Sequence, residues 1–190
     1  MNQEQGNTDR EYCPNFERTG TCIHGELCTK IHRTPEISRC IVFHHLYPDP
    51  QFFSDAIDNP SILQFTNEEK TNYLNAFYLD VYYMLIQFGP LDDLLIASNR
   101  TESMVGNVFA MFREVDAAAA CLLALNHHYY AGRKILITFT PITRLSSAVC
   151  QGIDDGKCQL GDKCFFIHPF NVPIYSEVFP RVQRMFATPF

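Results

Sequence analysis

Long apolar runs and a secretory signal are both missing from this sequence of 190 residues. No apolar stretch approaches the roughly 20 residues that a membrane-spanning helix needs, and the opening MNQEQGNTDREY is too polar for a signal peptide. We therefore expect the chain to fold in a reducing compartment. There, its eight cysteines are better explained as metal ligands than as disulfides.

The sequence also lacks an excess of positive charge. Its 15 Lys and Arg against 21 Asp and Glu give a formal net charge of −6, which argues against binding nucleic acid by bulk electrostatics. The negative charge is concentrated in residues 41–140, with five basic and eleven acidic side chains, whereas residues 1–40 carry five and six and residues 141–190 carry five and four. We therefore expect any nucleic-acid contact at the two ends and a basic protein partner in the middle.

Near each end the sequence contains a similar cluster of three cysteines and one histidine. The first reads C-x8-C-x5-C-x3-H and the second C-x7-C-x5-C-x3-H. The members are Cys13, Cys22, Cys28 and His32 in the first cluster, and Cys150, Cys158, Cys164 and His168 in the second. Three thiolates and one imidazole satisfy the tetrahedral preference of Zn²⁺, so the repeat predicts two zinc ions rather than ordinary buried thiols. Because protein fills all four positions, the zinc is expected to be structural.

The two remaining cysteines, Cys40 and Cys121, have no partners at matching spacing. We interpret them as small apolar residues, one in a strand and one in a helix. The sequence also contains no nucleophile–base pair, no glycine loop for phosphate and no open metal site. It therefore does not indicate an enzyme.

Between the clusters, the pattern predicts six elements in the order β-α-β-β-α-β. The strands are expected at 40–47, 91–97, 105–112 and 135–140, and the helices from Thr66 to Phe88 and from Glu114 to Asn126. Thr66 and Glu69 have the spacing of a capping box, which marks a helix start. This order is that of an RNA-recognition motif, an α+β fold in which two helices back a four-stranded antiparallel sheet.

The predicted organisation is therefore a central domain flanked by two small fingers. We expect the first finger at 10–36, the RNA-recognition-motif-like domain at 38–142, the second finger at 146–172 and a helical segment at 173–190. The predicted sheet is poor in the aromatic residues on which such domains stack bases. Val42, Val105 and Asn107 occupy the expected aromatic and basic positions. Only Phe109 offers a ring on that face, so we expect the sheet not to read RNA.

The first predicted helix is more apolar than one small sheet requires. Thirteen of the sixteen residues from Tyr73 to Phe88 are apolar or aromatic, whereas a helix on such a sheet buries a single stripe. Two explanations remain open. Either a finger or the C-terminal segment covers the rest of the helix, or another protein does.

The order of finger, central domain and finger resembles a known family. The segments that carry the resemblance are GTCIHGELC, VGNVFAMF, LNHHYYAG, TPITRLSSAVC and GDKCFFIH. They are similar to the small subunit of the U2 auxiliary factor of the spliceosome, over about residues 10–170. The resemblance implies a nuclear protein whose two fingers together bind the AG dinucleotide at the 3′ splice site. It also implies that the central domain is a U2AF-homology motif, which binds a tryptophan-containing peptide of the large subunit instead of RNA.

The resemblance also implies which residues contact the partner. The family's Arg-x-Phe loop falls on His128, Tyr129 and Tyr130, so a histidine replaces the arginine and Tyr129 replaces a tryptophan. Of the acids that the family carries on its first helix, Asp80 is the clear remaining one. We therefore expect Asp80, Tyr83, His128, Tyr129 and Tyr130 to form a partner interface that is more apolar than is usual in the family.

The RNA-facing residues are expected in the fingers, because unpaired bases stack on rings while lysine and arginine hold phosphates. The candidates are Phe16, Arg18, Thr29 and Lys30 in the first finger, and Lys157, Lys163, Phe165 and Phe166 in the second. One ring per finger is expected to pack beneath the zinc site, and in the second finger we expect this of Phe166. The resulting hypothesis is an RNA-binding splicing subunit that forms a heterodimer. The alternative is a protein-interaction scaffold whose fingers are purely structural.

Overall fold

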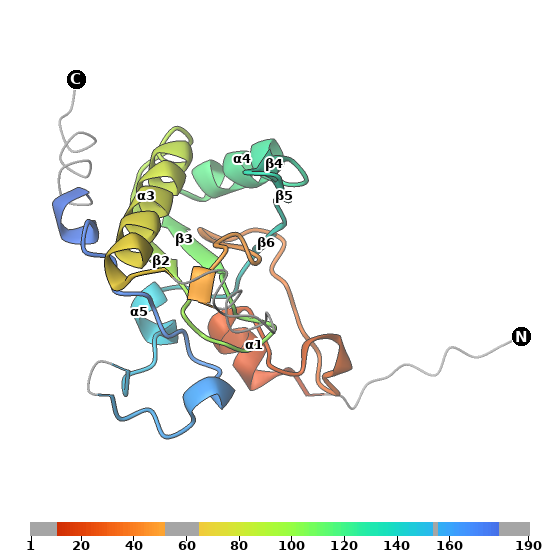
Figure 1. The fold of residues 1–190 in the computed structure, drawn as a ribbon. Coiled ribbons are helices and arrows are strands. Elements are labelled where there is room, and N and C mark those ends of the chain that lie inside the picture. Colours follow the sequence, from red (N-terminus) through yellow and green to blue (C-terminus); the bar gives the residue numbers. More distant parts are fainter. Residues whose placement is uncertain (1–10, 52–64, 154–155, 179–190) are drawn as a thin grey trace, which may run out of the picture.

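The computed structural model describes residues 11–51, 65–153 and 156–178. Its centre is an antiparallel sheet of order β2-β3-β1-β6. The strands are β1 (Cys40–Phe43), β2 (Leu91–Ile96), β3 (Val108–Phe112) and β6 (Ile137–Phe139). Helices α3 (Asn67–Leu85) and α4 (Val115–Leu125) cover one face of this sheet (Figure 1). This arrangement is that of an RNA-recognition motif, so the predicted α+β fold class is confirmed.

The capping box predicted for the first helix is present at the start of α3. The Thr66 hydroxyl accepts the amide of Glu69 at 3.1 Å, and the Glu69 carboxylate accepts the amide of Thr66 at 2.8 Å. The helix ends at Leu85 instead of Phe88. Pro90 follows soon after, and the residue before a proline is disfavoured in the helical conformation. That residue, Gly89, has φ +154° and is not helical.

The third strand begins at Val108, later than predicted, because the chain turns at Gly106. Gly106 has φ +67°, and a Cβ at this position would lie 2.2 Å from the carbonyl oxygen of Tyr47. The next residue, Asn107, is fully buried. It accepts the amide of His45 at 2.9 Å and donates to the carbonyl of Ser103 at 2.9 Å. Asn107 therefore joins two loops and does not stand on the open face of the sheet.

A short hairpin, which the sequence pattern does not predict, follows α4. Its strands are β4 (Tyr129–Tyr130) and β5 (Arg133–Lys134), which pair antiparallel. Both residues between them have positive φ, +46° at Ala131 and +77° at Gly132. Two consecutive positive φ values are typical of the tight turn that matches the twist of a hairpin. The hairpin lies beside α4 (Figure 1), and its Tyr130 contacts Phe77 and Asp80 of α3.

The helix-facing side of the sheet forms the larger hydrophobic core, and the C-terminal segment extends it. Phe170, Ile174, Tyr175 and Val178 pack against this core, and the Tyr175 hydroxyl donates to Asp93 Oδ1 at 3.2 Å. The Tyr175 ring also lies edge-on to Tyr78 of α3, with centroids 6.1 Å apart. The chain itself therefore covers part of the apolar surface of α3. Of the predicted segment at 173–190, residues 175–178 are helical, and 179–190 lie outside the described residues.

The opposite face of the sheet is covered by the two fingers, which lie beside each other on it (Figure 1). The elements of the fingers and the linker before the second one are α1 (Pro14–Thr19), η1 (Gly25–Leu27), α5 (Leu145–Ala148) and η3 (Gly161–Lys163). A second buried cluster fills this interface: Cys40, Val42, Ala97, Met104, Phe109, Met111, Ile142, Leu145, Ala148 and Ile167. Phe109 is completely buried, so the expectation of an open ring on this face was wrong. Residues of the fingers and of the linker before the second finger cover this sheet face in place of solvent.

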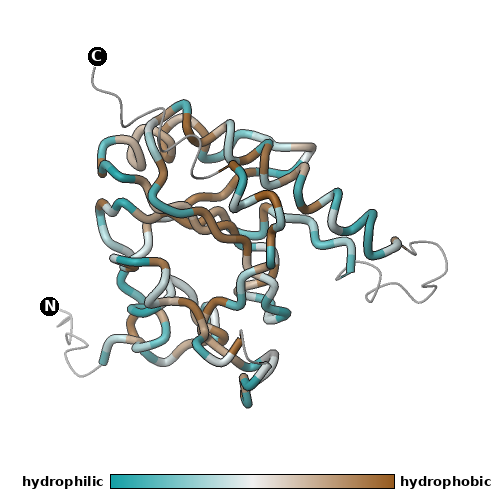
Figure 2. Tube along the Cα trace, turned by 90° about the vertical axis from the view of Figure 1, so that its left-hand side faces the viewer, coloured by the Kyte–Doolittle hydropathy of each residue, from teal (hydrophilic) through white to brown (hydrophobic). Residues whose placement is uncertain are grey.

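Two contacts attach the first finger to this face. The Thr21 hydroxyl lies 2.6 Å from the sulfur of Met104. Gly20, with φ +71°, packs so closely on Thr140 that a Cβ would lie 2.8 Å from its side chain. Figure 2 shows the most hydrophobic parts of the chain running through the middle of the molecule, between the helices and the fingers. Within the described residues, no helix has the length and apolar character needed to cross a membrane.

The two cysteines without partners lie where they were predicted. Cys40 is in β1 and Cys121 is in α4, and both are completely buried. Burial raises the pKa of each thiol to about 12, so both stay protonated and unreactive at neutral pH. Both therefore serve as small apolar residues of the two hydrophobic clusters to which they belong.

Candidate functional site

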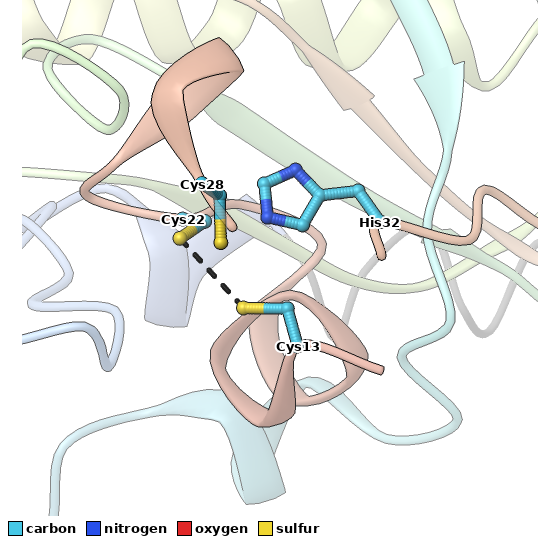
Figure 3. A group of neighbouring side chains, drawn as sticks. All are labelled: Cys13, Cys22, Cys28 and His32. Atoms are coloured by element: carbon cyan, nitrogen blue, oxygen red, sulfur yellow. Dashed lines mark hydrogen bonds between the residues drawn. The ribbon is translucent and has the colours of Figure 1, made fainter. Parts of the chain in front are cut away.

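The first Cys3His cluster is assembled by a short helix, a bridge and a tight turn. Pro14 begins α1 directly after Cys13, and Gly20 ends it in the left-handed conformation. The amide of Cys13 donates to the carbonyl of Ile31 at 2.9 Å, which brings Cys13 beside His32. In Figure 3, the three sulfur atoms and the imidazole ring point toward one another. One ligand atom from each of the four residues lies within 4.8 Å of all the others.

This geometry fits a zinc ion. Tetrahedral coordination with Zn–S bonds of ~2.3 Å places two sulfur ligands ~3.8 Å apart, and Cys13 Sγ lies 3.7 Å from Cys22 Sγ. His32 Nε2 is buried and has no hydrogen-bond partner within the described part of the chain, as expected of a nitrogen that serves as a metal ligand. Burial raises the pKa of Cys22 to about 11, so metal binding displaces a proton from this thiol.

The second cluster repeats the backbone arrangement of the first. The amide of Cys150 donates to the carbonyl of Ile167 at 2.9 Å, as Cys13 does to Ile31. Each cluster has a short helical turn before its third cysteine, and that turn begins at a glycine with similar positive φ, +47° at Gly25 and +49° at Gly161. The ligand atoms of Cys150, Cys158, Cys164 and His168 again lie within 4.8 Å of one another. The chain therefore holds two zinc sites of one design.

The aromatic residues predicted to bind RNA are half-buried, and two of the predicted residues join the fingers. The guanidinium carbon of Arg18 lies 5.1 Å from the ring centroid of Phe166. Phe165 stacks beside Phe166, with centroids 4.9 Å apart. In the first finger, Phe16 stacks on the zinc-ligand candidate His32 at 4.5 Å. Phe166 therefore contacts both Arg18 and Phe165, and Phe16 packs directly against the first zinc site.

The remaining RNA-binding candidates lie on the exposed surface of the fingers. Thr29 and Lys30 are exposed beside the first zinc site, and Lys157 and Lys163 are exposed in the second finger. Lys30 forms an ion pair with Glu11, with Nζ 3.1 Å from Oε2. Its positive charge is therefore partly neutralised by an acid of the same finger.

A cavity of about 620 Å³ lies between α3 and the hairpin. Three of the five predicted partner residues line it, namely Asp80, Tyr83 and Tyr130. The Tyr130 hydroxyl donates to Asp80 Oδ2 at 2.6 Å, and the ring of Tyr130 lies edge-on to Phe77 at 5.8 Å. Burial, and then the Asp80 carboxylate, raise the pKa of Tyr130 above its usual value, so the hydroxyl keeps its proton at neutral pH. We call this cavity the α3 pocket.

The other two predicted partner residues lie outside the lining of the α3 pocket. His128 and Tyr129 are exposed, and 72% of Tyr129 is accessible. In the hairpin, Tyr129 pairs with Lys134 and Tyr130 pairs with Arg133. Because neighbouring residues of a strand point to opposite sides, Tyr130 faces the pocket while Tyr129 faces away from it.

Comparisons with known proteins point to one family. The family model for zinc fingers of the C-x8-C-x5-C-x3-H type (and similar) matches residues 8–33. One splicing factor of Arabidopsis thaliana, named as a U2af small subunit, is 31% identical over 186 residues, which cover 94% of this chain and 63% of that protein. Another U2af small subunit of the same plant is 33% identical over 186 residues, covering 94% of this chain and 60% of that protein. The chain is homologous to the U2AF small subunits.

This homology agrees with the family named from the sequence. The chain spans less than two thirds of the length of these two U2AF relatives. Both relatives are named as splicing factors, which agrees with the expectation that the chain is not an enzyme. Among solved structures, the Rna15 RRM with bound RNA (GU) has a TM-score of 0.35 and 15% identity, over 63% of this chain and 95% of that chain.

Proposed function

We propose that this chain is the RNA-binding small subunit of a nuclear splicing heterodimer. In this proposal, its two zinc fingers bind single-stranded RNA at the AG of the 3′ splice site. The α3 pocket receives a tryptophan-containing peptide of a large subunit. The names of the U2AF relatives support the splicing role, and the contacts of the described residues support the division of labour between fingers and central domain.

The observation that carries the RNA part is the position of Phe165 and Phe166. The sheet face that RNA-recognition motifs use for bases is filled here by the fingers, and Phe109 is buried in it. Half-buried rings remain in the fingers themselves, at the place where Arg18 of the first finger meets Phe166 of the second. Rings and a guanidinium group together offer unpaired bases a stacking surface. An RNA strand bound there touches both fingers.

The observation that carries the partner part is the apolar lining of the α3 pocket. Tyr73 and Tyr83 of α3 line it and remain 41% and 53% exposed, even though the C-terminal segment covers another part of the helix. A pocket of about 620 Å³ is within the size range of sites that enclose one bulky ligand group. The indole of tryptophan has the apolar area and the N–H donor that such a pocket and its Asp80 suit.

Binding of short RNA to the zinc-loaded protein tests the RNA part. Fluorescence anisotropy compares a nine-nucleotide RNA that contains UAG with a strand of the same composition in scrambled order. We expect the UAG strand to bind at least about tenfold more tightly, because hydrogen bonds to the edges of unpaired bases carry sequence preference and one good bidentate base contact is worth roughly 1–3 kcal/mol of discrimination. Equal affinity for the two strands, or no binding, would instead favour a protein-interaction scaffold with purely structural fingers.

Peptide binding tests the partner part separately. The chain contains no tryptophan, so the emission of a tryptophan in an added peptide is observed without background from the protein. We expect this emission to shift to shorter wavelength on binding, and a peptide with alanine in place of the tryptophan to lose at least about tenfold in affinity. Replacing Tyr83 with alanine is expected to weaken binding, whereas Leu123→Ala, on the exposed side of α4, is the matched control.

A further inference from the structure

We propose that Asn99 is a positioning residue for the second zinc finger. Its side chain holds the backbone at His168 and Phe166, and so couples metal retention and the RNA-facing ring to the central sheet. The coupling to the metal stands by itself, and the coupling to RNA rests on the proposed function. Asn99 is neither a predicted ligand nor one of the RNA-binding candidates.

The contacts of Asn99 reach across 67 and 69 positions of sequence. Its Oδ1 accepts the amide of His168 at 2.8 Å, and its Nδ2 donates to the carbonyl of Phe166 at 2.9 Å. The residue lies just after β2 and is only 3% exposed. If its partners move away, the buried side-chain amide keeps the full free-energy cost of desolvation, because water does not replace the lost hydrogen bonds.

Neighbouring bonds hold the same segment of the second finger against the edge strand β2. The amide and the hydroxyl of Ser98 both donate to the carbonyl of His168, at 2.7 and 2.9 Å. The amide of Phe170 donates to the carbonyl of Ile96 at 2.8 Å. Both backbone groups of His168 are therefore bonded to the central domain, so the domain fixes the position from which the imidazole reaches the zinc.

This arrangement acts as an outer shell of the metal site. Groups that orient a zinc ligand without touching the metal commonly change metal affinity by about 10–100-fold when they are removed. Here the outer shell comes from a separate domain of the fold. Loosening it is expected to free His168 and, two residues earlier, Phe166, which carries the contact with Arg18.

The substitution that tests this role is Asn99→Asp. It keeps the acceptor for the His168 amide, but it replaces the donor to Phe166 with a carboxylate oxygen, which repels the carbonyl. Asn107→Asp is the matched control. Asn107 is also a buried asparagine that accepts one amide, from His45, and donates to one carbonyl, of Ser103. The same chemical change is thus made in the same domain, at a side chain whose hydrogen bonds go to loops of the central domain, at His45 and Ser103.

Loss of zinc to an excess of chelator is the measurement. The amide resonances of Gly25 and Gly161, at equivalent positions of the two fingers, report each site separately. We expect Asn99→Asp to release zinc from the second site about tenfold faster, while the first site stays within about twofold of wild type. In the control, both sites should stay within about twofold. An unchanged second site, or equal acceleration of both sites, would overturn the proposal.

RNA affinity gives the second readout. We expect Asn99→Asp to lower affinity for the UAG strand at least about fivefold at saturating zinc, with Asn107→Asp near wild type. An Asn99→Asp protein that loses zinc faster but binds RNA as wild type does would overturn the link to Phe166. If wild-type protein shows no RNA preference, the proposed function fails, and the zinc measurement still decides the role of Asn99.

Hydrogen exchange in the wild-type protein tests the contact without any substitution. The His168 amide, bonded to Asn99 Oδ1, is expected to exchange as slowly as the Phe170 amide, which is bonded to Ile96. Fast exchange at His168 would show that the bond to Asn99 is not maintained in solution, and would overturn the proposal even if Asn99→Asp failed to fold.

Discussion

The guanidinium group of Arg18 lies over the ring of Phe166, 5.1 Å from its centroid. One residue belongs to α1 of the first finger and the other to the second finger, between its third cysteine and its histidine. An exposed cation–π contact of this kind is worth roughly 0.5–1 kcal/mol. It joins the two fingers, and in the proposed function it is weak enough for an RNA base to stack beside it. The testable consequences of this arrangement begin with the metal.

Purified protein is expected to contain two zinc ions per chain, one for each Cys3His cluster. Replacing Cys28 or Cys164 with serine should reduce the zinc content to one and unfold the finger concerned, because metal binding supplies the folding energy of so small a unit. Elemental analysis together with protein concentration measures the ratio. Cys121→Ser, at a buried cysteine outside both clusters, should keep two zinc ions. A wild-type ratio of one or less would contradict the prediction.

Removing the ring of Phe165 is expected to weaken RNA binding without loss of zinc. Phe165 is half-buried and stacks on Phe166 at 4.9 Å, and a base stacked on such a ring gains roughly 1–3 kcal/mol. Phe165→Ala should therefore lower affinity for the UAG strand by about tenfold or more in anisotropy measurements. Phe65→Ala, at an exposed ring before α3, serves as control and should bind as wild type does.

Neutralising Glu11 is expected to strengthen RNA binding. The Glu11 carboxylate pairs with Lys30 at 3.1 Å, and the side chains are 83% and 42% exposed, so the pair itself contributes only about 0–1 kcal/mol. Glu11→Gln releases Lys30 for a phosphate. This should raise RNA affinity by roughly 2–5-fold. It should also make the slope of log affinity against log salt concentration more negative by about 0.7, the value for one further phosphate contact on a single strand.

The matched control is Glu26→Gln, which removes the same charge from an exposed site in η1 of the same finger. Equal gains for the two variants would mean that only the net charge matters. Lys30→Ala should lower affinity and abolish the gain from Glu11→Gln.

Replacing Phe109 with alanine is expected to destabilise the fold. From the sequence alone, Phe109→Ala was expected to matter little for RNA binding, because the sheet offered a single open ring and was not expected to read RNA. The side chain is instead completely buried between β3 and the fingers, where removing a phenylalanine ring typically costs about 3–5 kcal/mol. Urea denaturation in excess zinc measures the loss, and Leu136→Ala, at a 44% exposed side chain, should change stability little.

Binding of the tryptophan peptide in the α3 pocket is expected to depend only weakly on salt. Asp80, the acid of the pocket, already accepts the Tyr130 hydroxyl at 2.6 Å, and much of the lining is aromatic. Burial of apolar area at about 25 cal/mol per Å² is insensitive to ionic strength. Calorimetric titrations at 50 mM and 500 mM salt test this. A loss of affinity of tenfold or more would show that ion pairs hold the peptide.

The elements that the sequence predicted well are those with a local cause. The spacing of Cys13, Cys22, Cys28 and His32 is enough to close a loop around one ion. Thr66 and Glu69 lie three residues apart and exchange the two hydrogen bonds of a capping box, which marks the start of α3. The four strands and two helices follow from apolar periodicity in the same way, although their ends shift by a few residues where Gly89 and Gly106 turn the chain.

What the sequence did not predict depends on segments that meet only in the fold. Phe109 is buried because fingers from both ends of the chain share one face of the sheet. Asn99 bonds to residues of the second finger more than 60 positions away, with 67 separating it from Phe166. The opposite directions of Tyr129 and Tyr130 depend on a hairpin whose turn, Ala131–Gly132, gives only a weak local signal.

The first finger packs on parts of the central domain that the ribosome synthesises much later. Gly20 rests on Thr140, and Thr21 on Met104, yet the finger emerges long before either partner is made. At elongation rates of about 5–20 residues per second, Thr140 follows Gly20 by roughly 6–24 s. During that interval the finger can already take up its metal, but Gly20 and Thr21, which are buried in the finished protein, are not yet covered by the sheet. The nascent chain therefore carries a metal-loaded finger with an open docking surface until the sheet is complete.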